Sequence, residues 1–215
     1  MFAMFAMFAM AAIATPSVAG TPPLAATPPP DDFVSAAPAC EPERAYCFSI
    51  HLHVADGAIA PPWIGTQIAM ANQQFATVST SFKIVKVDSQ SIDHVVTIAD
   101  RASLKKYVTN RVIHVFITNA LEDVDVADKQ IRGVTLKKDD TKYIILSAIA
   151  PDRVLAHELG HLFGLPHSKY AISIMNKTQR AEPPMEQRTF APEEIVALKA
   201  GVKRLVRAKI LATSK

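Results

Sequence analysis

Three histidines and a glutamate near residue 160 have the residue types and the spacing of a zinc site. The segment His157–His167 reads H-E-x-x-H-x-x-G-x-x-H with no position missing. Residues i and i+4 of an α-helix lie on one face, so His157 and His161 can offer their imidazoles to one ion. Gly164 then permits the left-handed turn that ends a helix, and the chain can return His167 to the same ion. Three imidazoles leave a fourth position open, which is typical of catalytic zinc sites.

Glu158 adds a group that metal binding alone does not need. It directly follows the first histidine, where its carboxylate can accept a proton from a water activated by the metal. A bare H-E-x-x-H also occurs on ordinary helices whose histidines are merely packed or solvated. A glycine and a third histidine at fixed offsets make coincidence remote. We therefore predict one catalytic Zn²⁺ ion, bound by His157, His161 and His167.

Together with the segment Ser173–Asn176, this stretch resembles the metzincin zinc metalloproteases. The resemblance covers roughly residues 150–176. It implies a zinc endopeptidase in which Glu158 is the general base and acid. Met175 would be the Met-turn residue, a hydrophobic floor beneath the imidazoles. Ser168, directly after the third histidine, is the residue that matrixins carry at that place, whereas gluzincins and aspzincins fit less well because their third ligand is a carboxylate.

The resemblance also implies an α/β (α+β) fold. In this fold a twisted mixed sheet has an antiparallel edge strand and two backing helices, one of them the zinc helix, and a small C-terminal subdomain ends in a helix. The hydrophobic periodicity fits this order. Strands are expected over residues 48–54, 82–87 and 112–118, followed by a hairpin of residues 131–136 and 143–146. Helices are expected over residues 63–78 and 102–108, from Pro151 into the zinc helix, and from residue 191 onward.

Two regions are candidates for substrate binding under this resemblance. An extended substrate would add to an exposed strand edge, and the candidate edge contains Gly133, Val134 and Thr135. The loop of residues 176–190 would wall the pocket for the residue that follows the cleaved bond. Arg180 and Arg188 in this loop suggest a preference for an acidic side chain there. Two arginines that simply face solvent are the favoured alternative.

The N-terminal region indicates export. Residues 1–14 form an uncharged apolar run, and small residues follow, so residues 1–19 are predicted to be a signal peptide. Residues 20–39 are rich in Pro, Ala and Thr and predict an extended linker. The catalytic domain would then cover residues 40–215, with an upper subdomain (40–167) and a lower one (168–215). We expect a secreted or exported protein, extracellular or periplasmic.

The chain contains 2 cysteines, Cys40 and Cys47. In an exported protein a local disulfide is the favoured interpretation. The competing hypothesis is that Cys40 or the Asp31–Asp32 pair folds back on the zinc and keeps the enzyme latent. A folded pro-domain does not fit between the expected cleavage site and Cys40.

Composition limits the possible partners. The formal net charge of +3 is too small to argue for nucleic acid. The basic residues after position 190 are interpreted as a solvated helix face. No segment beyond the N-terminal run is long and apolar enough for a transmembrane helix. We expect protein or peptide substrates and a monomer.

The other histidines suggest a further site only weakly. His51 and His53 lie on one face of an expected strand, which raises the idea of a second metal. A solvent-facing polar row is the favoured interpretation. His94 and His114 are isolated in the sequence and are not assigned a function.

These observations define two classes of function. The first is a secreted zinc-dependent endopeptidase that hydrolyses peptide bonds by a zinc-activated water with Glu158 as general base. The alternative is a non-proteolytic zinc-binding or interaction protein on the same scaffold, which has no need of Glu158. Hydrolysis of a non-peptide amide by the same chemistry is a smaller third possibility.

Overall fold

A five-stranded mixed sheet organises the molecule in a computed structural model that describes residues 28–138, 141–178 and 180–214. Its strand order is β2-β1-β4-β7-β6. The first four are parallel, and β6 pairs antiparallel with β7 at the edge. The strands are β1 (Tyr46–Ala55), β2 (Thr80–Gln90), β4 (Ile113–Thr118), β6 (Gly133–Lys138) and β7 (Thr141–Ser147). The expected mixed sheet with an antiparallel edge strand is confirmed.

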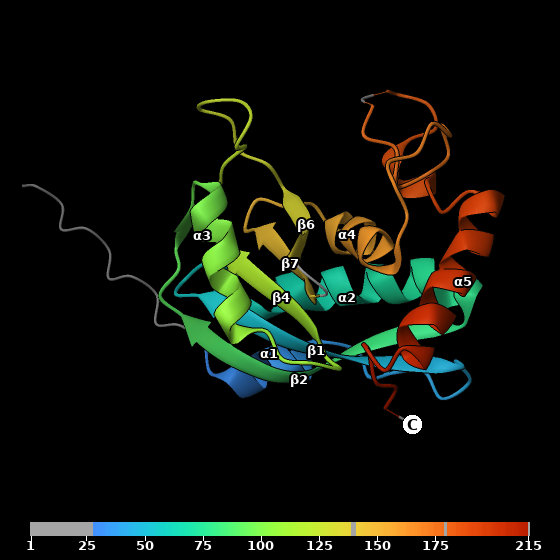
Figure 1. Ribbon diagram of the computed structural model, residues 1–215, viewed down its shortest axis with the longest axis horizontal. Helices are drawn as coiled ribbons and strands as arrows, with labels where there is room; N and C mark the ends of the chain where they lie inside the picture. Colours follow the sequence, from blue (N-terminus) through green and yellow to red (C-terminus); the bar gives the residue numbers. More distant parts are fainter. Residues whose placement is uncertain (1–27, 139–140, 179, 215) are drawn as a thin grey trace, which may run out of the picture.

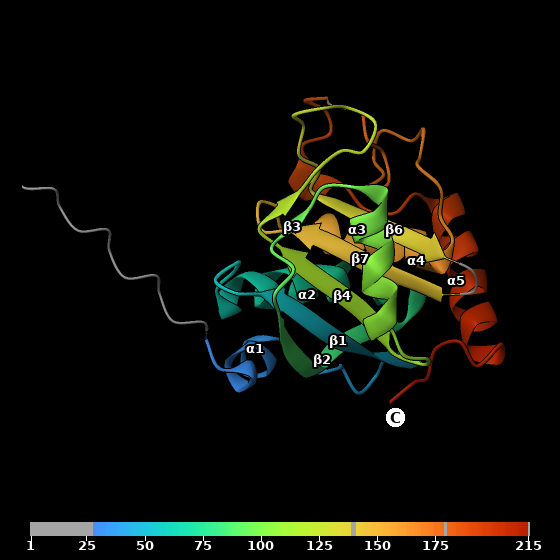
Figure 2. The ribbon, with the colours of Figure 1, turned by 60° about the vertical axis from the view of Figure 1, so that its left-hand side comes forward.

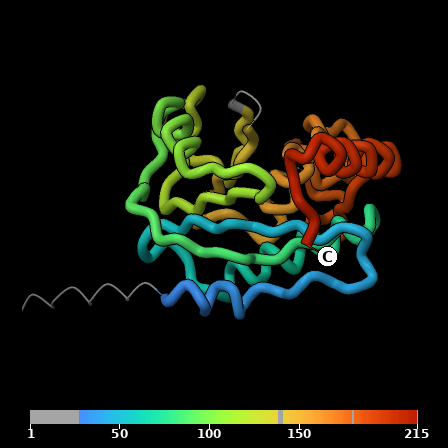
Figure 3. The backbone as a smooth tube through the Cα atoms, turned by 60° about the horizontal axis from the view of Figure 1, so that its bottom comes forward, coloured from blue at the N-terminus to red at the C-terminus, as the bar shows by residue number. Residues whose placement is uncertain are grey.

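Helices cover both faces of this sheet. On one face, α2 (Pro61–Phe75) packs beside α4 (Val154–Phe163). On the other, α3 (Ile98–Ser103) crosses in front of β4 and β7, as Figure 2 shows. Figure 3 likewise places α2 and α3 on opposite sides of the strands. Close to α4 and following the site region in sequence lies α5 (Pro192–Arg207), the expected C-terminal helix (Figure 1).

Alternation along β1 explains why the sheet has two different faces. Ile50, Leu52 and Val54 are buried in the large core beneath α2 and α4. Residues between them point the other way, toward a smaller core that contains Phe116 and Tyr143. From Ile50 to Val54, even-numbered residues of β1 therefore face the large core, and odd-numbered residues face the opposite side of the sheet.

Shorter elements complete the fold. A two-stranded sheet pairs β3 (His94–Val95) with β5 (Ala120–Leu121), and neither strand was expected. Turns of 3₁₀ helix occupy Ala76–Val78, Leu104–Tyr107 and Met185–Gln187. The helix expected over residues 102–108 begins earlier, because the Thr97 hydroxyl accepts from the Asp100 N–H and caps α3. The zinc helix begins at Val154, because Pro151 lies in a turn in which its carbonyl accepts from the Val154 N–H at 3.0 Å.

The N-terminal region differs in part from its prediction. The expected signal peptide and the linker as far as residue 27 lie outside the described residues. The second half of the expected linker contains α1 (Pro30–Ala36), with Pro30 in its first turn and Asp31 and Asp32 near its positive end. Phe33 is fully buried in the main core. The prediction of an extended chain, which was based on proline content, is therefore wrong for Pro30–Ala36. Burial of the Phe33 side chain in the core stabilises a helix in this segment.

The two cysteines form the expected disulfide, Cys40–Cys47, with Cα atoms 5.8 Å apart. This pairing leaves Cys40 without a thiol to bind a metal, so the competing latency hypothesis is wrong for Cys40. The bond ties the segment after α1 to the second residue of β1. Within the described part of the chain, no helix has the length and apolar character needed to cross a membrane.

Candidate metal centre

The segment predicted to bind zinc has the expected helix and turn. His157 and His161 lie one turn apart on α4, which ends at Gly164 in a left-handed conformation with φ of 110°. The N–H of Gly164 and that of Leu165 both donate to the Gly160 carbonyl, at 3.1 and 2.9 Å. The reversal returns His167 to the first two rings. Its ring centroid lies 5.5 Å from that of His157 and 4.8 Å from that of His161.

Backbone carbonyls fix which nitrogen of two histidines faces the centre. Nδ1 of His157 donates to the Ile174 carbonyl, and Nδ1 of His161 donates to the Leu165 carbonyl, each at 2.7 Å. Both Nε2 atoms therefore carry lone pairs, yet they lie only 3.1 Å apart. Two facing lone pairs at this distance need a cation between them. The candidate ligand atoms of all three histidines lie within 4.8 Å of one another, so the donor set fits one zinc ion.

Burial keeps these imidazoles in the form that binds metal. It lowers the pKa of His157 to about 4 and also lowers the pKa of His161 and of His167. All three rings are therefore neutral at neutral pH and need lose no proton to bind an ion. His167 is the exposed member, and it opens the centre to solvent.

Glu158 lies beside the centre as a buried carboxyl group. The hydroxyl oxygen of Thr135 on β6 lies 2.8 Å from both its Oε2 and its backbone oxygen. Burial raises the pKa of Glu158 to about 7, while the Thr135 hydroxyl acts to lower it. The single proton of that hydroxyl can serve one of the two acceptors at a time. The Glu158 side chain is thus held in one place by Thr135.

Met175, the expected Met-turn residue, packs closely against α4 at Gly160. Its side chain is fully buried, and a Cβ placed on Gly160 would lie 2.5 Å from its sulfur. Only glycine at position 160 lets α4 and the methionine approach this closely. Ser173 accepts from the Met175 N–H at 2.9 Å and donates to Glu194 on α5 at 2.7 Å. The turn is therefore tied to the C-terminal helix.

A cleft of about 410 Å³ opens onto the centre. Its walls contain the three edge-strand residues predicted to bind substrate, together with Glu158 and two of the histidines. The lining residues are Gly133, Val134, Thr135, Lys137, Lys142, Glu158, His161 and His167. The structure thus brings the predicted residues of β6 together with the metal centre.

The two arginines of the following loop are placed differently. Arg188 is buried, and its guanidinium donates to the carbonyls of Pro183 and Arg180 at 3.0 and 2.9 Å. The favoured expectation of a solvent-facing side chain is wrong for Arg188, because the loop uses its donors to satisfy its own carbonyls. Arg180 is exposed. Neither arginine is among the residues that line the cleft.

Two contacts near the centre had no signal in the sequence. One is the hydroxyl of Thr135 on Glu158, which depends on how β6 packs against α4. The other is Lys142, whose ammonium donates to the carbonyls of His161 and Leu162 at the end of α4, at 3.0 and 2.8 Å. A cation there satisfies the last carbonyls of the helix. The expected hairpin placed Thr135 in a strand and Lys142 in the turn, and its pattern gave a contact partner for neither residue.

The fold and the centre together support a metzincin-like zinc metallopeptidase. The model of the matrixin family, Peptidase M10, matches residues 129–195, which contain β6, β7, α4 and the Met175 turn. This match covers less than half of the chain. No curated protein matches the chain in sequence.

Solved structures are similar in fold. The chain aligns with metalloproteinase-II from Bacteroides fragilis with a TM-score of 0.57 and 12% identity, over 73% of this chain and 53% of that one. It thus spans about half the length of that protein. Archaemetzincin from Methanopyrus kandleri aligns with a TM-score of 0.49 and 18% identity, over 75% of this chain and 98% of that one.

Proposed function

We propose that this chain is a secreted zinc-dependent endopeptidase with one catalytic zinc ion. The observation that carries the proposal is the buried Glu158 carboxyl in the wall of the cleft, next to facing lone pairs on His157 and His161. A protein that only binds zinc has no use for a carboxyl group at this cost of burial. The site would hold the ion through His157, His161 and His167.

Each residue of the site has a role in this proposal. Bound zinc would polarise a peptide carbonyl and make a water molecule more acidic. Glu158 would accept a proton from that water and deliver it to the leaving amine. Burial favours proton uptake by this carboxyl, because it raises the pKa of Glu158. Thr135 would hold the carboxyl in position.

The edge of β6 is the proposed substrate platform. In the five-stranded sheet β6 pairs with β7 on one side only, so its outer edge can accept an extended peptide. Gly133, Val134 and Thr135 line the cleft along this edge. Because Arg188 is engaged within its own loop, an acidic preference after the cleaved bond would rest on Arg180 alone. The matrixin subfamily is proposed from Ser168, whose N–H donates to the Met175 carbonyl at 3.0 Å.

Export is proposed from the N-terminal sequence, with the catalytic domain at residues 40–215. The disulfide between Cys40 and Cys47 is compatible with an oxidising compartment outside the cytosol. We further propose that the enzyme acts as a monomer on protein or peptide substrates. Sedimentation of the purified protein and N-terminal sequencing of the exported form test these two points.

The decisive experiment compares the purified full chain with Glu158→Gln. Zinc content is measured by mass spectrometry, and cleavage is measured on casein and on a peptide library. The proposal expects zinc in both proteins and cleavage only in the first. Zinc in both with cleavage in neither would favour the non-proteolytic zinc-binding alternative, and a folded protein without zinc would exclude the proposal.

A further inference from the structure

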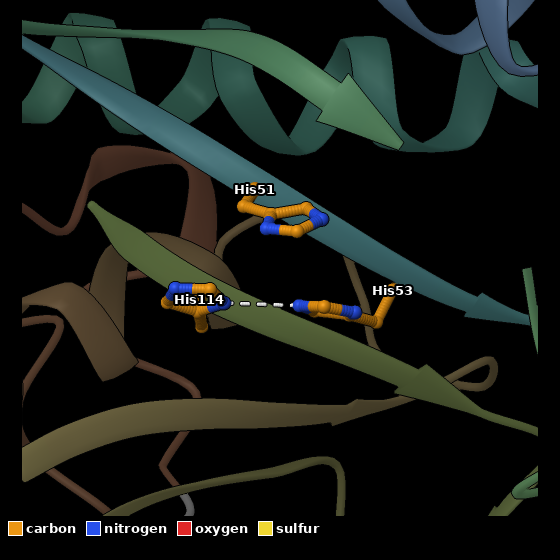
Figure 4. Close-up of side chains that lie close together, drawn as sticks. All are labelled: His51, His53 and His114. Atoms are coloured by element: carbon orange, nitrogen blue, oxygen red, sulfur yellow. Dashed lines mark hydrogen bonds between the residues drawn. The ribbon is translucent and has the colours of Figure 1, made fainter. Parts of the chain in front are cut away.

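A second cluster of three histidines lies within the sheet. His51 and His53 extend from β1 and His114 from β4, as Figure 4 shows. His53 and His114 are fully buried, and the side chain of His51 is 12% exposed. The expectation that His51 and His53 form a solvent-facing row is therefore wrong, because aromatic side chains cover this face of the sheet. The ring centroids of Tyr107 and Phe116 lie 6.1 and 4.4 Å from that of His53. His114 is likewise not isolated.

The strand register brings these rings together. His51 and His114 are direct partners in the parallel pairing of β1 with β4, and His53 is two residues further along the same face. Ring centroids are 4.1 Å apart for His51 and His53, 5.0 Å for His51 and His114, and 5.3 Å for His53 and His114. One candidate ligand nitrogen from each lies within 4.8 Å of the others. This spacing is shared with the cluster on α4.

A β-bulge supplies the cluster with a carboxylate. In the pairing of β1 with β2, Ile50 lies opposite Ile84 but His51 lies opposite Lys86, so Val85 is an extra residue. The extra residue reverses the parity of β2, and Asp88 then faces the histidine side of the sheet. Its Oδ2 accepts from Nε2 of His51 at 2.7 Å. Bulges of this kind re-aim side chains at functional positions.

We propose that His51, His53 and His114 form a second metal site, for a zinc-like late transition metal ion. Imidazole nitrogens select such ions over Ca²⁺ and Mg²⁺, which prefer oxygen ligands. Asp88 fixes the proton of His51 on Nε2 and leaves Nδ1 as the ligand atom, and in Figure 4 a nitrogen of His51 faces the gap between the other two rings. A carboxylate behind a histidine is the usual arrangement at protein metal sites.

The competing explanation is a hydrogen-bonded pair without an ion. The Thr109 N–H donates to Nε2 of His114 at 3.0 Å, so the proton of that ring is on Nδ1, from which it is donated to Nε2 of His53 at 2.9 Å. An ion would replace this proton and return it to Nε2 of His114, so the Thr109 N–H, which now donates to that nitrogen, would have to turn away. The Thr109 hydroxyl oxygen, 3.1 Å from that nitrogen, can then accept that proton. His51 takes no part in this hydrogen bonding. The pair of His53 and His114 therefore does not explain why His51 lies beside them or why Asp88 hydrogen-bonds to His51.

An ion at this site would have a structural role. The cluster lies on the sheet face opposite α4, and none of its three histidines lines the cleft beside the α4 cluster. His51 provides the exposed side through which an ion could enter. A closed site of this kind joins β1, β4 and, through Asp88, β2.

The test uses the full chain carrying His157→Ala and His161→Ala, so that the α4 cluster cannot bind. This protein is loaded with Zn²⁺ and separately with Co²⁺, then dialysed. Metal content, the cobalt absorption spectrum and far-UV circular dichroism are measured. The proposal expects one ion per chain and a spectrum of nitrogen-ligated cobalt. A folded protein that retains no ion would overturn it and leave only the hydrogen-bonded pair.

Two added substitutions and one control assign the site to these residues. In that background, His51→Asn should raise the Zn²⁺ dissociation constant by more than about 100-fold, because a ligand is lost. Asp88→Asn keeps all three ligands and should raise it by about 10-fold, the effect of an outer carboxylate. The exposed His94 provides the matched control His94→Asn, expected to leave affinity unchanged. Equal affinity in all of these proteins would place the ion elsewhere. None of these readouts depends on proteolysis, so they stand apart from the proposed function.

Discussion

The two histidine clusters lie on opposite faces of one sheet and differ in what holds their nitrogens. On α4, carbonyl oxygens occupy Nδ1 of His157 and of His161 and leave two lone pairs facing at 3.1 Å. In the sheet, His53 and His114 are as close, at 2.9 Å, but a proton can lie between them. Both clusters therefore have two histidine nitrogens about 3 Å apart. They differ in which ring nitrogens carry a proton, because different neighbouring groups hydrogen-bond to the rings.

Access separates the clusters further. The α4 cluster has an exposed member, His167, and opens onto a cleft of about 410 Å³ with a carboxyl group in its wall. The sheet cluster is closed over by aromatic rings, with Phe116 stacked on His53 at 4.4 Å between centroids. An ion on α4 can meet a substrate, whereas an ion in the sheet can only stabilise the fold.

The largest expected effect concerns the carboxyl group of the α4 cluster. Glu158→Gln should lower kcat/KM for peptide cleavage by about 10³-fold, because an amide cannot accept the proton. Zinc content should be unchanged, since Glu158 is not a ligand. Glu193→Gln, an exposed change on α5, is the control. Cleavage that survives in Glu158→Gln would mean that another group is the base.

Acid should destabilise the metal-free protein partly through the sheet cluster. Burial lowers the pKa of His53 to about 3 and that of His114 to about 4. Unfolded histidines bind protons below about pH 6.5. The unfolded state therefore takes up more protons, and stability is complete above pH 6.5 and is lost as pH falls toward 4.

The loss attributable to each of these histidines at pH 5 is about 2 kcal/mol. Urea unfolding of the chelator-treated protein at pH 7 and pH 5 measures it. His114→Asn should reduce the pH dependence, because a group that titrates only in the unfolded state has been removed. Identical pH dependence in the two proteins would contradict these lowered pKa values.

The packing beneath the α4 cluster gives the next effect. Gly160→Ala should lower the free energy of unfolding by about 1–3 kcal/mol, because the added methyl group collides with the Met175 sulfur. The same change combined with Met175→Ala should cost less than the sum of the two single changes. Additive losses in thermal or urea unfolding would show that the two residues do not press on each other.

Thr135→Val should have the smallest effect, about a 10-fold lower kcat at neutral pH. Without the hydroxyl, the pKa of Glu158 rises, because the hydrogen bond from Thr135 lowers it. The base must be ionised, so the acid limb of the pH–rate profile should move to higher pH. Thr135→Ser retains the hydroxyl and should restore the wild-type profile. An unmoved acid limb would assign Thr135 a packing role only.

The α4 cluster could be predicted from sequence because its geometry is local. Helical spacing and one glycine determine where His157, His161 and His167 lie, and a short hairpin likewise determined β6 and β7. The sheet cluster could not, because it depends on the pairing of β1 with β4 and on the bulge at Val85. Both are settled by tertiary packing between segments far apart in the sequence, since His53 and His114 are separated by 61 residues and His51 and Asp88 by 37.

The same division applies to smaller features. The hydroxyl of Thr135 on Glu158 and the ammonium of Lys142 on α4 are contacts between elements 19 to 23 residues apart, and no spacing rule anticipates them. Phe33 was assigned to a linker because the composition of a segment does not show whether one of its side chains packs into the core. Local periodicity thus predicted most elements, while side-chain partners across elements required the structure.

The bulge at Val85 has a consequence for the evolution of this scaffold. One inserted residue decides whether Asp88 lies behind His51 or in the apolar core. A single codon gained or lost in β2 would therefore switch the carboxylate of the sheet cluster on or off while every histidine codon stayed the same. Homologues that differ by this codon alone would differ in whether a carboxylate lies behind His51, but would keep the three histidines of the sheet cluster and the three of the α4 cluster.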